Sequence, residues 1–180
     1  MTPARSFEAA VLPCLDGAYN LARWLLRDDG EAEDVVQEAS LRALRYFGSL
    51  RDGPAKPWFL AIVRNLCFTH LEERRGRREQ TGYEDEALEG LQHDAGQSAP
   101  DPAQALDGAR ERTRIDAAIR ALAPPLREVI VLRELEGLDY AEIAQVAGIP
   151  IGTVMSRLSR ARGRLREMLQ QAGIRGPEST

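Results

Sequence analysis

Two groups of side chains in this sequence have the types and the spacing that recognise nucleic acid, and the first lies before its midpoint. Trp58 and Asn65 fall on one face of an expected helix, away from its apolar side, with Lys56 and Arg64 beside them. An aromatic ring can stack on an unpaired base, an amide can hydrogen-bond to it, and cations can hold phosphates. A tryptophan packed on a neighbouring helix, beside a solvated basic surface, is the alternative, and spacing alone favours it.

The second group belongs to a helix-turn-helix pattern in the C-terminal third of the sequence. Ala144, Gly148 and Val154 have the spacing of that motif. The small alanine permits close approach of two helices, the glycine permits the turn, and the valine closes a small core. The pattern predicts helices over 140–147 and 153–171, and a plain helical hairpin is the alternative.

The helix expected over 153–171 has an apolar side and a polar side. Val154, Leu158 and Ala161 recur at helical spacing and should face a core. A rotation of about 100° per residue turns other early side chains outward or to the flanks, namely Thr153, Met155, Ser156, Arg157, Ser159 and Arg160. We expect Arg157 to hold a phosphate and Arg160 to bind a guanine edge, with a phosphate as the alternative for Arg160.

The elements that position these side chains begin with two helices in the N-terminal part. One is expected over 31–47, with an apolar stripe of Val36, Ala39, Ala43 and Phe47. The other is expected over 57–75, because proline is favoured at the first helical position, and its apolar stripe contains Phe59, Ile62, Val63, Leu66 and His70. The face of the first helix that turns away from its stripe carries Asp34, Gln37, Glu38 and Leu41. By pattern alone this face is a solvated surface.

The C-terminal helices have clear local start and stop signals. Two prolines separate a short helix over 114–122 from one over 126–135, which Gly137 ends. Asp139 and Glu142 have the spacing of a capping box, which should begin the helix over 140–147.

Composition favours an all-α fold without a catalytic or metal site. The chain has 180 residues, 43% hydrophobic, 6% aromatic and 29% charged, and it lacks strand-like alternation of β-branched residues. Cys67 and His70 have metal-ligand spacing, but no second pair of ligands lies nearby in the sequence. Phosphate-binding glycine motifs and nucleophile motifs are absent. We therefore expect no cofactor, no metal and no enzymatic activity.

The cysteine content and the hydropathy pattern indicate the compartment. Cys14 and Cys67 are the only cysteines, which excludes a disulfide scaffold and suits a reducing environment. No apolar run approaches the roughly 20 residues that a membrane span needs. We expect a cytoplasmic protein without direct membrane insertion.

Charge is strongly segregated along the chain, although the net charge is only −4. Lys56 is the one lysine among 24 basic residues, and an arginine excess favours planar recognition of phosphates or bases. Residues 79–107 carry eight acids and no base, with several glycines and prolines, which is typical of a tether. We expect two small helical domains, 1–78 and 109–175, joined by a flexible acidic linker over 79–108.

Three runs of this sequence resemble, in the same order, regions 2 and 4 of bacterial sigma factors of the extracytoplasmic-function branch. They cover both helical zones, and the third is highly specific: AEDVVQEASLRALRYF (32–47), KPWFLAIVRNLCFTHLEERRGR (56–77) and LREVIVLRELEGLDYAEIAQVAGIPIGTVMSRLSRARGRL (126–165). The resemblance implies a transcription initiation factor that binds core RNA polymerase and promoter DNA. A stand-alone helix-turn-helix regulator, acting without polymerase, is the alternative function.

The resemblance also assigns roles to the residues singled out above. It implies that Asp34, Gln37, Glu38 and Leu41 dock on core polymerase, which replaces the interpretation as a solvated surface. Lys56, Trp58, Arg64 and Asn65 would open and read the −10 promoter element. Thr153, Met155, Ser156, Arg157, Ser159 and Arg160 would contact the −35 duplex. The acidic linker would pass through the RNA path of the polymerase, and an anti-sigma factor is an expected partner because such partners are common in the family.

Overall fold

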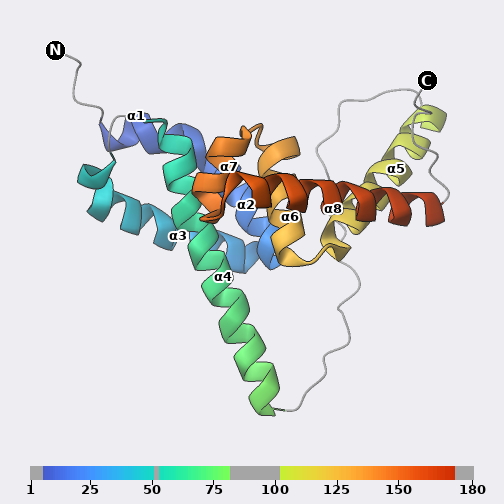
Figure 1. Cartoon of the computed structure of the whole chain (residues 1–180), viewed down its shortest axis with the longest axis horizontal. Coiled ribbons are helices and arrows are strands. Elements are labelled where there is room, and N and C mark those ends of the chain that lie inside the picture. Colours follow the sequence, from blue (N-terminus) through green and yellow to red (C-terminus); the bar gives the residue numbers. More distant parts are fainter. Residues whose placement is uncertain (1–5, 51–52, 82–101, 173–180) are drawn as a thin grey trace.

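The computed structural model describes residues 6–50, 53–81 and 102–172, and this part of the chain is helical without a strand (Figure 1). The all-α prediction is therefore confirmed. The N-terminal half consists of α1 (Phe7–Val11), η1 (Leu12–Cys14), α2 (Leu15–Leu26), α3 (Asp29–Tyr46), η2 (Phe47–Ser49) and α4 (Ala55–Thr81). Among the helices that the structure describes, none is long and apolar enough to cross a membrane.

Helices α2, α3 and α4 pack on one another around a core that includes Leu21, Leu25 and Phe59. The corner between α2 and α3 is tight, because Arg27 adopts the left-handed conformation with φ of 62°. Asp28 then begins α3, and its side chain accepts a hydrogen bond from the Glu31 N–H at 2.8 Å. The acids at the start of α3 thus lie where the helix dipole favours negative charge.

The buried stripe of α3 differs by one residue from the predicted stripe. Ala39 and Ala43 are buried as expected, but Val35 is fully buried whereas Val36 is half-buried at the edge of the stripe. Phe47 lies beyond the helix in η2, where its ring meets the ring of Phe7 edge-on at 5.5 Å. Buried positions of a helix recur every three or four residues, and Val35 lies four residues before the buried Ala39. This spacing favours burial of position 35, which the sequence reasoning passed over.

The C-terminal half consists of α5 (Pro102–Ala121), α6 (Pro124–Ile130), the π-helical segment η3 (Val131–Leu135), α7 (Tyr140–Ala147) and α8 (Ile151–Gln171). The single helix predicted over 126–135 is thus an α-helix that continues as a π-helical segment. The predicted capping box is confirmed, with hydrogen bonds in both directions between Asp139 and Glu142. Gly148 ends α7 with φ of 65°, which permits the turn into α8.

The two halves pack against each other in one continuous hydrophobic core. Helix α4 lies against α7, and α2 lies against α6 and η3 (Figure 1). The ends of the predicted linker, 79–81 and 102–108, belong to α4 and α5, while its residues 82–101 lie outside the described part of the chain. The domain boundaries expected from the sequence stay a prediction.

Both cysteines are buried, and we expect neither to react in the folded protein. Burial raises the pKa of the Cys67 thiol to about 12, with the nearby Glu128 charge adding to the shift. Because the thiolate is the reactive form, a disulfide reagent at about pH 8 should modify the native chain only slowly. The absorbance of the thiol released from the reagent should show that both cysteines react rapidly in urea. Rapid reaction without denaturant would contradict the burial of the two thiols.

Candidate nucleic-acid interface

The predicted base-stacking face of α4 is only partly open to solvent. Trp58 is half-buried against the core, and its ring meets the Phe47 ring at a centroid distance of 6.3 Å. In this conformation Trp58 has the packed position that its spacing favours. Asn65 is exposed on the same helix, and its side-chain oxygen accepts a hydrogen bond from Arg64 Nη1 at 3.3 Å.

The two predicted cations of α4 are held by the C-terminal half of the chain. Arg64 Nε donates to Glu128 Oε1 at 2.6 Å, and its guanidinium lies 4.0 Å from the centroid of the Phe68 ring. Lys56 Nζ lies 3.0 Å from Glu136 Oε2 and donates to the Glu136 carbonyl at 2.9 Å. These partners come from positions 64 and 80 residues away in the sequence.

Four of the six α8 side chains predicted to face DNA lie on the side of the helix that faces away from its core, and the other two lie at its flank. Val154, Leu158 and Ala161 are buried as predicted. Met155, Ser156, Ser159 and Arg160 are exposed, whereas Thr153 and Arg157 are half-buried. An open hollow on this side of the domain is lined by Tyr140, Met155, Ser159, Arg162, Gly163 and Arg166.

The arginines of α8 differ in how firmly they are engaged. Arg160 is exposed, and its Nε donates to the Ser156 carbonyl at 3.4 Å. Arg162 is bound to Glu134 at 2.8 Å, and this hydrogen bond raises the pKa of its guanidinium. Arg157 is partly covered, with its Nη1 3.8 Å from Glu128 Oε2.

The four residues predicted on the outer face of α3 lie together on one side of that helix. Asp34, Gln37 and Leu41 are exposed, and 64% of the Leu41 surface is accessible. Glu38 is half-buried and accepts a hydrogen bond from Arg42 Nη2 at 2.6 Å. The face therefore combines carboxylates with an exposed leucine.

Sequence reasoning missed Glu128, a fully buried carboxylate between the two predicted DNA-binding surfaces. It binds Arg64 of α4 and lies near Arg157 of α8. Burial raises the pKa of this carboxyl group, while the hydrogen bond and charge of Arg64 oppose the shift. An acid directly before the apolar run 129–132 was the signal available, because such a run indicates burial on all sides.

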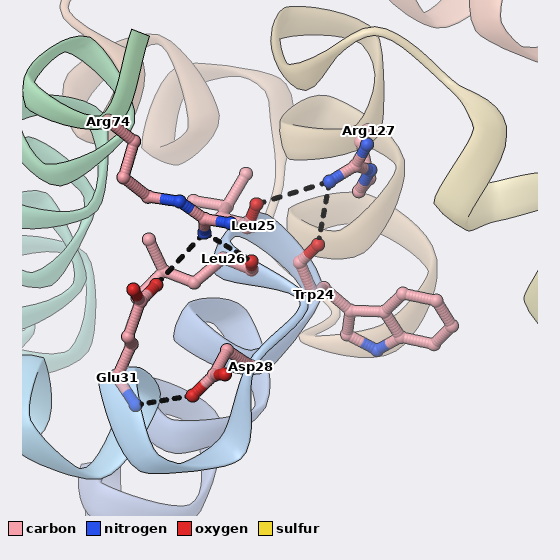
Figure 2. A network of polar contacts seen from close by, with 7 residues as sticks. All are labelled: Trp24, Leu25, Leu26, Asp28, Glu31, Arg74 and Arg127. Carbon is pink, nitrogen blue, oxygen red and sulfur yellow. Dashed lines mark hydrogen bonds and ion pairs between the residues drawn. The ribbon is translucent and has the colours of Figure 1, made fainter. Parts of the chain in front are cut away.

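Sequence reasoning also missed Arg127, which joins the two halves through backbone carbonyls. Its Nη1 donates to the carbonyls of Trp24 and Leu25 at 3.0 and 3.2 Å (Figure 2). Its Nη2 donates to those of Arg120 and Leu122 at 2.8 and 2.7 Å. Burial lowers the pKa of Arg127 to about 10, so the group stays charged at neutral pH.

A second arginine completes the cap at the C-terminus of α2. Arg74 of α4 donates to the Leu26 carbonyl at 3.2 Å and binds Glu31 at 3.0 Å (Figure 2).

In the described part of the chain, no group of three histidine, cysteine or acidic residues could hold a metal ion. The candidate interface therefore consists of cations, amides, hydroxyls and an aromatic ring.

Comparison with known proteins yields two family models that match this chain. "Sigma-70 region 2" matches residues 11–77, and "Sigma-70, region 4" matches residues 112–165. The "RNA polymerase sigma-H factor" of Pseudomonas aeruginosa is 35% identical over 171 residues, which cover 92% of this chain and 87% of that protein. The "ECF RNA polymerase sigma factor SigE" of Mycolicibacterium smegmatis is 34% identical, over 91% of this chain and 62% of the relative's length.

Two solved structures have the same fold. The sigma factor RpoE of Bartonella quintana, crystallised with the anti-sigma factor NepR, aligns with a TM-score of 0.74 and 28% identity. That alignment covers 91% of this chain and 96% of RpoE. CnrH, in complex with the cytosolic domain of CnrY, aligns with a TM-score of 0.61 and 23% identity over 92% of this chain and 88% of CnrH.

Proposed function

Because this chain belongs to the extracytoplasmic-function sigma factors of the sigma-70 family, we propose that three of its surfaces divide the work of transcription initiation. Members of the family direct RNA polymerase to promoters and are not enzymes. The observation that carries this conclusion is the presence of region 2 and region 4, in that order, on one chain. A stand-alone helix-turn-helix regulator would not need region 2, so that alternative has no support.

The outer face of α3 is the proposed contact with core RNA polymerase. Asp34, Gln37, Glu38 and Leu41 are near neighbours on that face, which the rest of the described chain leaves accessible. Carboxylates around an exposed leucine suit a partner surface that is basic with an apolar centre. This contact would allow the chain to dock on polymerase without moving its own helices.

The first turns of α4 are the proposed −10 surface. Asn65 is open to solvent and can hydrogen-bond to an unstacked base. Trp58 would have to leave the Phe47 ring, at least in part, before a base could stack on it. Lys56 and Arg64 would hold phosphates beside that base once they were released from Glu136 and Glu128.

The outer side of α8 is the proposed −35 surface. The recognition helix of a helix-turn-helix enters the major groove with its N-terminal part. Met155, Ser156, Ser159 and Arg160 are exposed in that part of α8, flanked by Thr153 and Arg157. We assign base contact to Arg160 and phosphate contact to Arg157 and Arg162.

Two further aspects of the proposal concern partners and place. The solved structures of RpoE with NepR and of CnrH with CnrY have this fold, so we include an anti-sigma factor among the partners of this chain. Action on polymerase and promoter DNA implies the cytoplasm. We also propose that the chain consists of the domains 1–78 and 109–175, joined by the acidic linker 79–108.

Reconstitution with purified core polymerase tests the function directly. The chain should form a holoenzyme that produces run-off transcripts from promoters selected out of a random linear library. Transcripts should require both the chain and core polymerase. A chain that bound duplex sites without core polymerase, and gave no transcripts with it, would instead be a stand-alone regulator.

Arg160 and Arg162 should differ in what they contribute to the −35 contact. Arg160→Ala should weaken holoenzyme binding by about 1–3 kcal/mol and relax preference at one −35 position, because it removes a bidentate contact to guanine. Arg162→Ala should weaken binding evenly across sequences and lower the salt slope by about one. Selection from a −35 library measures both effects. Lost affinity without changed preference in Arg160→Ala would make Arg160 a phosphate anchor.

A further inference from the structure

A methionine near the start of α8 is exposed at the hollow that α7 and α8 line together. These two helices pack against each other (Figure 1). Met155 is 54% exposed, and it lines the hollow with Ser159 of α8 and Tyr140 of α7. Met155 and Ser159 also belong to the proposed −35 surface. The hollow therefore opens on the side of the domain that would face DNA.

The lining of the hollow follows one stripe of α8. Four exposed lining residues of this helix are spaced four, three and four positions apart, and these are Met155, Ser159, Arg162 and Arg166. Such spacing places them on one helix face. The neighbouring stripe, which begins at Val154, is buried. The exposed stripe is thus apolar toward the N-terminus of α8 and cationic toward its C-terminus.

The length of this stripe fits the distance from a base edge to the DNA backbone. A rise of about 1.5 Å per residue places Arg162 about 10 Å, and Arg166 about 16 Å, beyond Met155 along the helix. The major groove is about 12 Å wide, and the N-terminal part of a recognition helix enters it. When Met155 lies over base edges, the two arginines therefore lie near the phosphates that border the groove.

The walls of the hollow are held in place by contacts within the domain. The Arg133 guanidinium lies 5.2 Å from the centroid of the Tyr140 ring, and its Nη1 donates to the Leu138 carbonyl at 2.8 Å. Arg162 is bound to Glu134 at 2.8 Å. A surface that is already ordered loses little conformational freedom when it binds a ligand.

The chemistry of methionine limits what Met155 can recognise in the major groove. Its thioether has no hydrogen to donate and is only a weak acceptor. Among the groups that base pairs present in this groove, the C5-methyl group of thymine is the apolar one. Contact between Met155 and this methyl group would remove apolar surface of both from water. The Ser159 hydroxyl, one turn further along α8, can donate to the adjacent thymine O4.

We propose that Met155 determines specificity for a thymine of the −35 element by packing against the C5-methyl group of that base at this hollow. Arg162 and Arg166 hold phosphates of the adjoining backbone. The thymine contact is separate from the guanine contact assigned to Arg160. This inference rests on the proposed function, because that function places the outer side of α8 in the major groove.

Replacement of thymine by deoxyuridine tests this contact, because it removes only the C5-methyl group. A −35 sequence is first selected from a random library with the native holoenzyme. Each thymine of either strand is then replaced in turn. At one position the replacement should weaken holoenzyme binding about three- to fivefold, which is the effect of burying one methyl group. Competition against a fluorescein-labelled promoter, followed by anisotropy, measures the affinity.

Variants of the chain assign this loss to one side chain. Met155→Ala should weaken holoenzyme binding to the thymine duplex, and deoxyuridine should weaken it no further. Met155→Leu retains an apolar side chain and should retain most of the loss caused by deoxyuridine. Ile151→Ala is the matched control, because Ile151 is 48% exposed at the start of α8 but does not line the hollow. In this control the loss caused by deoxyuridine should equal that of the native chain.

The outcomes separate the Met155 contact from the function on which it rests. If no replacement by deoxyuridine weakens binding of the native holoenzyme, the chain reads no thymine methyl group and the inference is overturned. If the loss persists in Met155→Ala, or disappears in Ile151→Ala, another side chain contacts the methyl group and the inference is again overturned. Run-off transcripts from the native holoenzyme would still support the proposed function in these cases. If the native chain gives no transcripts with core polymerase, the proposed function fails and the Met155 contact fails with it.

Discussion

Arg127→Met is expected to lower the free energy of unfolding by about 3–5 kcal/mol, because it removes a buried charge whose partners cannot find new donors. Methionine retains most of the side-chain length and leaves the surrounding apolar contacts largely in place. Four backbone carbonyls lose their donors, those of Trp24, Leu25, Arg120 and Leu122. Urea denaturation followed by far-UV circular dichroism measures the change.

The position of two of these carbonyls explains why the effect should be large. Trp24 and Leu25 lie in the last turn of α2, where carbonyls have no partner within the helix. A cation there also interacts favourably with the helix dipole. Of the other two carbonyls, that of Arg120 belongs to the last turn of α5 and that of Leu122 to the connection between α5 and α6. One guanidinium thus joins a helix end of the N-terminal half to the end of α5 and the loop that follows it in the C-terminal half.

Arg74→Met is the matched control, because Arg74 also caps α2. It donates to the Leu26 carbonyl at 3.2 Å and pairs with Glu31, but its side chain is 32% exposed (Figure 2). Water can replace it, so the expected loss is about 1 kcal/mol or less. Equal losses in the free energy of unfolding for the two variants would show that burial of Arg127 between the halves does not determine how much it stabilises the fold.

The parts of the fold that the sequence predicts well are those fixed by neighbouring residues. The capping box of Asp139 and Glu142, the turn at Gly148 and the buried stripe of α8 depend on short-range spacing. Helical periodicity and capping chemistry depend on residues within about four positions of each other. A short stretch of sequence therefore contains all the information that predicts these features. The helix-turn-helix and the exposed face of α3 were accessible for that reason.

The contacts between the halves were not accessible, because they join residues far apart in sequence. Glu128 meets Arg64 across 64 residues, and Arg127 reaches the Trp24 carbonyl across 103. No periodicity links such positions. The residues next to an arginine in a basic segment predict only that its side chain is exposed to solvent. The sequence therefore indicates which side chains could bind DNA but not that Lys56, Arg64 and Arg157 are engaged by acids.

The outer face of α3 provides the second large effect. Asp34→Lys should weaken binding of the chain to core RNA polymerase by several kcal/mol, because an attractive charge contact becomes a repulsive one. Asp34 is exposed at the surface, so the substitution should leave the fold intact. Binding is measured by the change in fluorescence anisotropy of the labelled chain on titration with core polymerase. Circular dichroism should show unchanged helicity.

The same face allows the charge effect to be separated from the general effect of added positive charge. Glu72→Lys changes the net charge equally at an exposed position of α4 outside the proposed contact, and it should leave core binding nearly unchanged. Glu38→Lys should weaken core binding, but it also places a lysine beside Arg42, so its helicity must be checked first. Leu41→Ser should weaken binding without any charge change, since it removes the exposed apolar side chain of the face. Native affinity in both Asp34→Lys and Leu41→Ser would exclude this face of α3 as the polymerase contact, because neither its charge nor its apolar centre would then contribute.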